Sequence, residues 1–214
     1  MHIYGISGLG ADEWVFEAVN EYLENPITYV PWLQPEPHET LAHYAERMAG
    51  TLDTQDPFIL VGLSFGGMIA SEMNKHVHPE KTIIISSCAC ADELPIYFRG
   101  VGRMNLVPYI PTRLMQLPPP LVEAVMSLKK QASKRLIHDI MEHTDREFLK
   151  WAVQAILTWD NTEVPDRLKR IHGRADLLLP LKVTADEILE GGHLVIVEEP
   201  RLIAEAIQRS FPDA

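Results

Sequence analysis

The chain has 214 residues and carries 30 acidic against 19 basic side chains, a formal net charge of −11 at pH 7. This excess of acidic residues argues against a nucleic-acid-binding protein and against a protein that binds membranes through a polybasic surface. Hydrophobic residues make up 46% of the sequence, enough to bury a core, so disorder is not the expected state. A chain of this length is expected to form one globular domain.

The N-terminal residues His2 to Ile6 lack the basic stretch and long apolar run of a signal peptide. No run in the sequence reaches the ~18 apolar residues that a membrane span needs. Two cysteines, Cys88 and Cys90, are spaced too closely for an unstrained disulfide and are too few for a metal site. They are typical of reduced thiols in a cytoplasmic protein. With no signal peptide and no membrane span in the sequence, we expect no binding to a membrane. The sequence implies no metal or organic cofactor, so none is expected.

Apolar runs alternate with helical patterns up to Ser86. Strands are predicted at His2–Ile6, Ile27–Pro31, Pro57–Leu63 and Thr82–Ser86. Helices are predicted between them, at Ala11–Leu23, Thr40–Leu52 and Gly66–His78. Because these strands are continuously apolar rather than alternating, they are expected to be buried on both faces of a parallel sheet with helical crossovers. The pattern predicts a doubly wound α/β fold.

The pattern changes between approximately residues 90 and 160, where proline-rich sequence is followed by amphipathic stretches and no strand signal is present. The helical stretches are Leu121–Leu128, Ala132–Met141 and Glu147–Leu157. We interpret this segment as an all-helical cap inserted between two strands of one domain that spans residues 1–214. Strands return at Leu168–Gly173 and Glu187–Glu190, and a closing helix is predicted at Glu198–Phe211.

One motif carries chemistry. The residues Gly62-Leu63-Ser64-Phe65-Gly66 lie between an apolar strand and an amphipathic helix, the context in which Gly-x-Ser-x-Gly is informative. A serine at so tight a turn adopts a strained backbone conformation that exposes its hydroxyl, and the flanking glycines allow the chain to pass close to itself. The helix that follows directs backbone N–H groups toward the same point. This arrangement suits a nucleophile whose intermediate is an oxyanion.

A serine nucleophile needs a base, and the base needs an orienting acid. Of nine histidines, His193 is the candidate base, in the glycine-rich loop Glu190-Gly191-Gly192-His193 after the last predicted strand. His172, inside the fifth predicted strand, is expected to be structural. The candidate acid is Asp176, which follows that strand at the end where ligands bind in open α/β sheets.

The chain order Ser64, Asp176, His193 resembles that of the α/β-hydrolase superfamily, and the resemblance extends over most of the chain. The stretch Ser7-Gly8-Leu9-Gly10 is similar to the family's oxyanion loop. The resemblance implies about six parallel strands flanked by helices, as in small bacterial serine esterase-like hydrolases with a helical cap. It also implies oxyanion-hole donors at the backbone N–H groups of Leu9 and Phe65.

The sequence departs from the family pattern in three places. Ser7 stands where the family's loop has histidine, which alters the support of that loop. Two strands that normally precede the loop are missing. Only 193 − 176 = 17 positions separate Asp176 from His193, so the crossover between them is expected to be a turn or an extended link rather than a helix. Lower-ranked candidates for the acid are Asp186, Glu187 and Glu190.

The resemblance implies a serine hydrolase that cleaves a carboxylic ester or thioester of a small molecule through an acyl-enzyme. Two alternatives stay open: a lyase or C–C bond hydrolase with the same triad, and a non-catalytic small-molecule binder on the same fold. The residues Met126, Met141 and Phe98 could line an apolar pocket or could pack the cap onto the sheet. The same two interpretations apply to four further residues in this segment: Tyr97, Met104, Tyr109 and Met115.

Overall fold

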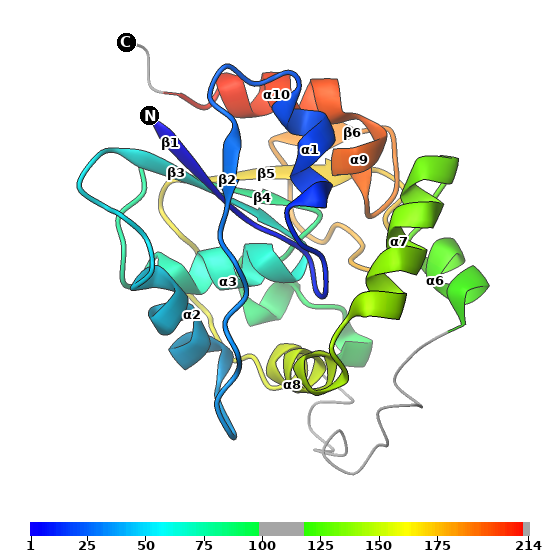
Figure 1. Ribbon diagram of the computed structural model, residues 1–214, viewed down its shortest axis with the longest axis horizontal. Helices are drawn as coiled ribbons and strands as arrows, with labels where there is room; N and C mark the ends of the chain where they lie inside the picture. Colours follow the sequence, from blue (N-terminus) through cyan, green and yellow to red (C-terminus); the bar gives the residue numbers. More distant parts are fainter. Residues whose placement is uncertain (99–117, 212–214) are drawn as a thin grey trace.

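The computed structural model describes residues 1–98 and 118–211, which form a six-stranded parallel sheet flanked by helices (Figure 1). The strand order is β2-β1-β3-β4-β5-β6. Its strands are β1 (His2–Ile6), β2 (Ile27–Tyr29), β3 (Phe58–Leu63), β4 (Lys81–Ile85), β5 (Leu168–Gly173) and β6 (Glu187–Leu189). Every pair of neighbouring strands is parallel, so the carboxyl ends of all strands meet at one edge of the sheet. The predicted fold class is confirmed.

The sheet separates two hydrophobic cores because side chains alternate between its faces along each strand. In β3, Phe58 and Leu60 point into one core, and Ile59, Val61 and Leu63 point into the other. Helices α2 (Leu41–Ala49) and α3 (Phe65–Met73) cover the first face. The second face is covered by helices α1 (Trp14–Asn20), α9 (Val195–Glu198) and α10 (Pro200–Gln208) (Figure 1).

The chain between β4 and β5 contributes a short 3-10 turn, η1 (Ala91–Glu93), and then three helices within the described residues. These helices are α6 (Pro119–Val125), α7 (Gln131–His143) and α8 (Arg146–Leu157). Helix α8 packs on the core with α2 and α3, whereas Ile137 of α7 joins the core on the opposite face. The insertion therefore contacts both layers at the end of the sheet where its strands finish (Figure 1).

Two helices differ most from the sequence-based prediction. The closing helix, predicted as one segment over Glu198–Phe211, is split into α9 and α10. Pro200 has no N–H and restricts the residue before it, and Glu199 accordingly leaves the helical region with φ −131° and ψ 54°. The third helix ends at Met73 instead of continuing to His78. By contrast, the link between β5 and β6 contains no helix, as its length predicts.

None of the helices in the described part of the chain is both long and apolar enough to cross a membrane. Cys88 and Cys90 are free and buried. Burial raises the pKa of the Cys88 thiol to about 12, so this side chain acts as a small apolar core residue at neutral pH.

Candidate active site

Ser64 occupies a strained turn between β3 and α3. Its backbone has φ 51° and ψ −119°, a conformation that a residue with a side chain rarely adopts. A β-carbon at Gly62 would lie 2.5 Å from the carbonyl oxygen of Gly66, and one at Gly66 would overlap the carbonyl oxygens of Ile6 and Ser7. Both positions therefore require glycine, and the tight turn leaves the Ser64 side chain partly exposed at the carboxyl edge of the sheet.

His193 bridges Ser64 and Asp176. Its Nε2 lies 2.8 Å from Ser64 Oγ, and its Nδ1 lies 2.7 Å from Asp176 Oδ2. The imidazole is almost fully buried, with His193 1% and Asp176 4% exposed. When Nδ1–H donates to the carboxylate, Nε2 is left as an acceptor for the serine proton. The structure thus brings together the three side chains that the sequence singled out, which lie just after β3, β5 and β6.

Asp176 is held as a carboxylate by its surroundings. Its burial by itself would raise its pKa, but the charge interaction with His193 and hydrogen bonds from His172, His193 and the Leu179 N–H outweigh burial. The pKa of Asp176 therefore lies well below its usual range. Oδ1 accepts from the backbone N–H of Leu178 at 2.9 Å and of Leu179 at 3.0 Å. These bonds fix the carboxylate in place and leave Oδ2 for His193.

His172, in β5, packs against the Asp176 carboxylate. Its Nε2 is 2.8 Å from the carbonyl oxygen of Leu179 and 3.4 Å from Asp176 Oδ2. Because a carbonyl oxygen can only accept, the shorter contact requires a hydrogen on Nε2. The same N–H group is the one that lies near the Asp176 carboxylate. His172 therefore contacts both Asp176 and the turn whose N–H groups hold the Asp176 carboxylate.

The three lower-ranked acids lie elsewhere. Asp186 accepts from the backbone N–H of Arg170 at 2.7 Å. Glu187 pairs with Lys169 at 2.7 Å and with Arg209 at 2.6 Å. Glu190 pairs with Arg174 at 2.6 Å on the surface. Asp176 is the carboxylate that reaches His193.

The loop after β1 lies beside the nucleophile. A β-carbon at Gly8 would stand 3.7 Å from Cβ of Ser64, so this loop passes directly alongside the Ser64 hydroxyl. Within the described part of the chain, the backbone N–H groups of Leu9 and Phe65 donate no hydrogen bond. Two unpaired donors flanking a nucleophile suit the stabilisation of an oxyanion. Ser7 supports the loop in place of histidine, because its buried hydroxyl donates to the carbonyl oxygen of Ala11 at 2.7 Å.

A cavity of about 270 Å³ opens onto Ser64 and His193. The sheet side contributes Leu9, Phe65 and Met68, and most of the remaining wall comes from the insertion. The insertion residues are all apolar apart from Thr144: Phe98, Val122, Met126, Leu136, Ile137, Ile140, Met141, Thr144, Leu149, Val153 and Ile156. His193 is the only titratable side chain among the described lining residues. Of the aromatic and methionine candidates, Tyr97 is exposed, and Met104, Tyr109 and Met115 lie outside the described residues.

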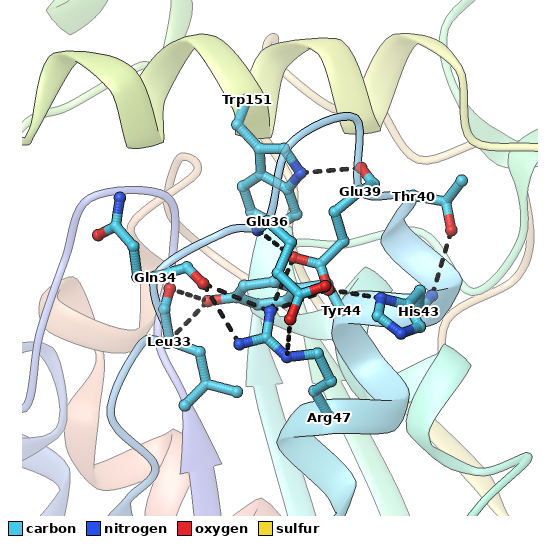
Figure 2. A network of polar contacts seen from close by, with 9 residues as sticks. All are labelled: Leu33, Gln34, Glu36, Glu39, Thr40, His43, Tyr44, Arg47 and Trp151. Carbon is cyan, nitrogen blue, oxygen red and sulfur yellow. Dashed lines mark hydrogen bonds and ion pairs between the residues drawn. The ribbon is translucent and has the colours of Figure 1, made fainter.

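A polar network anchors helix α8, and with it one wall of the cavity, to the loop before α2 (Figure 2). Trp151 donates from Nε1 to the carbonyl oxygen of Glu39 at 2.9 Å. Its ring packs on that of Tyr44, with 4.3 Å between the two ring centroids. Arg47 donates to both carboxylate oxygens of Glu39 at 2.9 Å, and His43 Nδ1 lies 2.7 Å from the same group. Burial alone would raise the Glu39 pKa, but these partners and a backbone hydrogen bond lower it. These contacts tie the loop to both α2 and α8.

Comparison with known proteins identifies the family. The sequence profile described as the alpha/beta hydrolase family matches residues 6–206. The chain belongs to the alpha/beta hydrolase family. A search of curated protein sequences gives no match to this chain. Its fold is nonetheless shared by many solved structures.

A lipase-esterase related protein from Clostridium acetobutylicum is similar to this α/β hydrolase at a TM-score of 0.69, with 18% identity over 98% of this chain and 94% of that chain. A thermophilic esterase from Thermogutta terrifontis is similar at a TM-score of 0.67, with 17% identity over 98% of this chain and 88% of that chain. A thioesterase of the prodiginine biosynthetic pathway in Streptomyces coelicolor is similar at a TM-score of 0.64, with 16% identity over 98% of this chain and 85% of that chain.

Sequence reasoning missed one residue of this α/β hydrolase's elbow. Ser87 follows β4, and its hydroxyl donates to the carbonyl oxygen of Ser64 at 2.5 Å. A β-carbon at Gly67 would overlap the Ser87 side chain. Ser87 thus holds the strained turn from the neighbouring strand. The signal that could have found it is its position at the carboxyl end of β4, next to β3 in the sheet.

Proposed function

We propose that this α/β hydrolase cleaves a carboxylic ester or thioester of a small molecule through an acyl-enzyme on Ser64. The observation that carries the proposal is the continuous chain of hydrogen bonds from Ser64 Oγ through His193 to Asp176. The N–H groups of Leu9 and Phe65 beside it, which are unpaired among the described residues, support the same chemistry. Esterases and a thioesterase among the structures that share the fold are consistent with this substrate class.

In the proposed first step, Ser64 Oγ attacks the substrate carbonyl carbon while His193 Nε2 takes the hydroxyl proton. The Leu9 and Phe65 N–H groups stabilise the oxyanion of the tetrahedral intermediate. Collapse of that intermediate releases the alcohol or thiol, which receives the proton from His193. Water then attacks the acyl group while His193 takes its proton. As the bond to Ser64 Oγ breaks, His193 returns that proton to the serine oxygen and the carboxylic acid leaves. Asp176 stabilises the imidazolium in both steps.

The cavity supports a neutral, apolar acyl group, over which the insertion acts as a cap. Each methylene buried in such a wall contributes about 0.8 kcal/mol, which corresponds to a gain of about fourfold in kcat/KM. We expect this gain for successive methylenes along a series of p-nitrophenyl esters, from acetate upward, until the cavity is filled. A hemisuccinate ester, of the same chain length as the butyrate but with a terminal carboxylate, is expected to react at least tenfold more slowly, because its charge has no partner there. Equal kcat/KM for butyrate and hemisuccinate would contradict an apolar acyl site.

Labelling with a fluorophosphonate probe tests the proposed nucleophile. Wild type is expected to react at Ser64, identified by mass spectrometry of the labelled peptide, because His193 activates the hydroxyl. His193→Ala is expected to label at least 100-fold more slowly, since the base is gone. His138→Ala, at an exposed histidine that pairs with Glu123, is the matched control and should label like wild type. A folded wild-type protein that does not label would refute the hydrolase proposal and favour a non-catalytic binder.

A further inference from the structure

Glu198 is a buried charge that the proposed chemistry does not use. It ends helix α9 and is only 2% exposed. A carboxylate is stable in such a position only when hydrogen-bond donors replace its water. The identity of those donors therefore indicates what the residue holds in place.

Within the described residues, the Glu198 carboxylate has three donors, all backbone N–H groups, from two segments far apart in the sequence. Oε2 accepts from Gly192 at 3.3 Å, in the loop that carries His193. Oε1 accepts from Lys129 at 2.9 Å and from Lys130 at 3.4 Å, in the segment between α6 and α7. The carboxylate thus bridges the histidine loop and the insertion.

The same two segments also touch directly, backbone to backbone. The N–H of His193 donates to the carbonyl oxygen of Met126 at 2.8 Å. A β-carbon at Gly192 would overlap the carbonyl oxygens of Met126 and Ser127, so the contact requires glycine there. Two hydrogen bonds consequently hold the backbone at His193. The His193 N–H binds Met126, and the N–H of the preceding Gly192 binds Glu198.

We propose that Glu198 is a positioning residue for His193, and that it makes the placement of the base depend on the 126–130 segment of the insertion. The proposal rests on the proposed function of His193. The imidazole must meet Ser64 and Asp176 at the same time, so a small shift of its backbone disturbs both hydrogen bonds. Met126 lines the cavity beside Ser64, so the segment that holds His193 also forms part of the wall of the proposed acyl site.

The test compares Glu198→Gln with Glu199→Gln. Glu199 is the adjacent residue, but its partly exposed carboxylate pairs only with the Lys130 ammonium, at 3.2 Å, among the described residues. A glutamine at 198 has a single acceptor oxygen and presents an NH₂ group to one of the two segments, so one attachment is lost. Glu198→Gln is expected to lower kcat for p-nitrophenyl acetate and the rate of fluorophosphonate labelling by about 10–100-fold, with KM changed less than about twofold. Glu199→Gln should leave all three values unchanged.

Amide hydrogen exchange separates this proposal from the proposed function. Exchange at Gly192 and His193 is expected to accelerate in Glu198→Gln and not in Glu199→Gln, whether or not the protein turns over an ester. A wild-type protein that fails to label refutes the hydrolase function, and faster exchange in Glu198→Gln would then still show that Glu198 positions the His193 backbone. A folded Glu198→Gln protein with wild-type kcat, labelling rate and exchange would overturn the positioning role. Lower thermal stability with unchanged kcat and labelling would overturn it too, by showing a purely structural role.

Discussion

Ser64→Ala is expected to lower kcat for the preferred ester by about 10⁶-fold, which is the largest effect expected from any single change in this protein. The substitution removes one oxygen atom, the nucleophile, and leaves the neighbouring groups in place. His193 and Asp176 keep their mutual hydrogen bond, and the Leu9 and Phe65 N–H groups are untouched. Steady-state kinetics with a p-nitrophenyl ester, together with the labelling assay, measures the loss.

Binding should survive this substitution. The Ser64 hydroxyl contributes one oxygen atom to the cavity wall, and the substitution leaves the rest of the wall unchanged. The Kd of a carboxylate product or a slow substrate, measured by calorimetry, is therefore expected to be within a fewfold of the wild-type value. Ser71→Ala is the matched control, because the Ser71 hydroxyl donates to the carbonyl oxygen of Gly67 within α3 and does not contact His193. Residual activity above one hundredth of wild type in purified Ser64→Ala would mean that another residue carries the reaction.

Asp176→Asn is expected to lower kcat by about 10⁴-fold while the fold is retained. An amide at this position can donate to His193 Nδ1, which stabilises the tautomer whose Nε2 carries the hydrogen. That tautomer cannot accept the proton from Ser64 Oγ. Asp186→Asn is the matched control, since Asp186 accepts only from the Arg170 N–H among the described residues. A similar loss in both variants would contradict the assignment of Asp176 as the partner of His193.

The same variant is expected to change how stability depends on pH. The pKa of Asp176 is lower in the folded protein than its ordinary value of 3.8. Its carboxylate therefore adds stability above about pH 4 that is lost as the pH falls toward the folded pKa. Urea unfolding from about pH 6 down to pH 3 should show a shallower decline in Asp176→Asn than in wild type. Parallel curves for the two proteins would contradict a depressed pKa.

The sequence by itself determined the sheet and the nucleophile turn, because both depend on local patterns. Continuous apolar runs such as Phe58–Leu63 can only be buried on two faces, and helical segments between them require parallel crossovers. The glycines around Ser64 are needed by the turn itself, whatever surrounds it. Helix ends were predicted less well, as at Pro200, where a local restriction on Glu199 interrupts an amphipathic pattern that continues on both sides.

The sequence ranked Asp176 first among four candidate acids, but only the tertiary structure shows that it meets His193 and what holds the base in place. Asp176, Asp186, Glu187 and Glu190 all lie within a few residues of the right strand ends, and sequence spacing does not give the direction of a side chain. Only the packed loop shows that Asp176 reaches Nδ1 at 2.7 Å. The bridge through Glu198 is likewise invisible in the sequence, because its partners are backbone N–H groups that every residue except proline provides. Contacts of this kind arise when distant segments pack together, and no residue type marks them in advance.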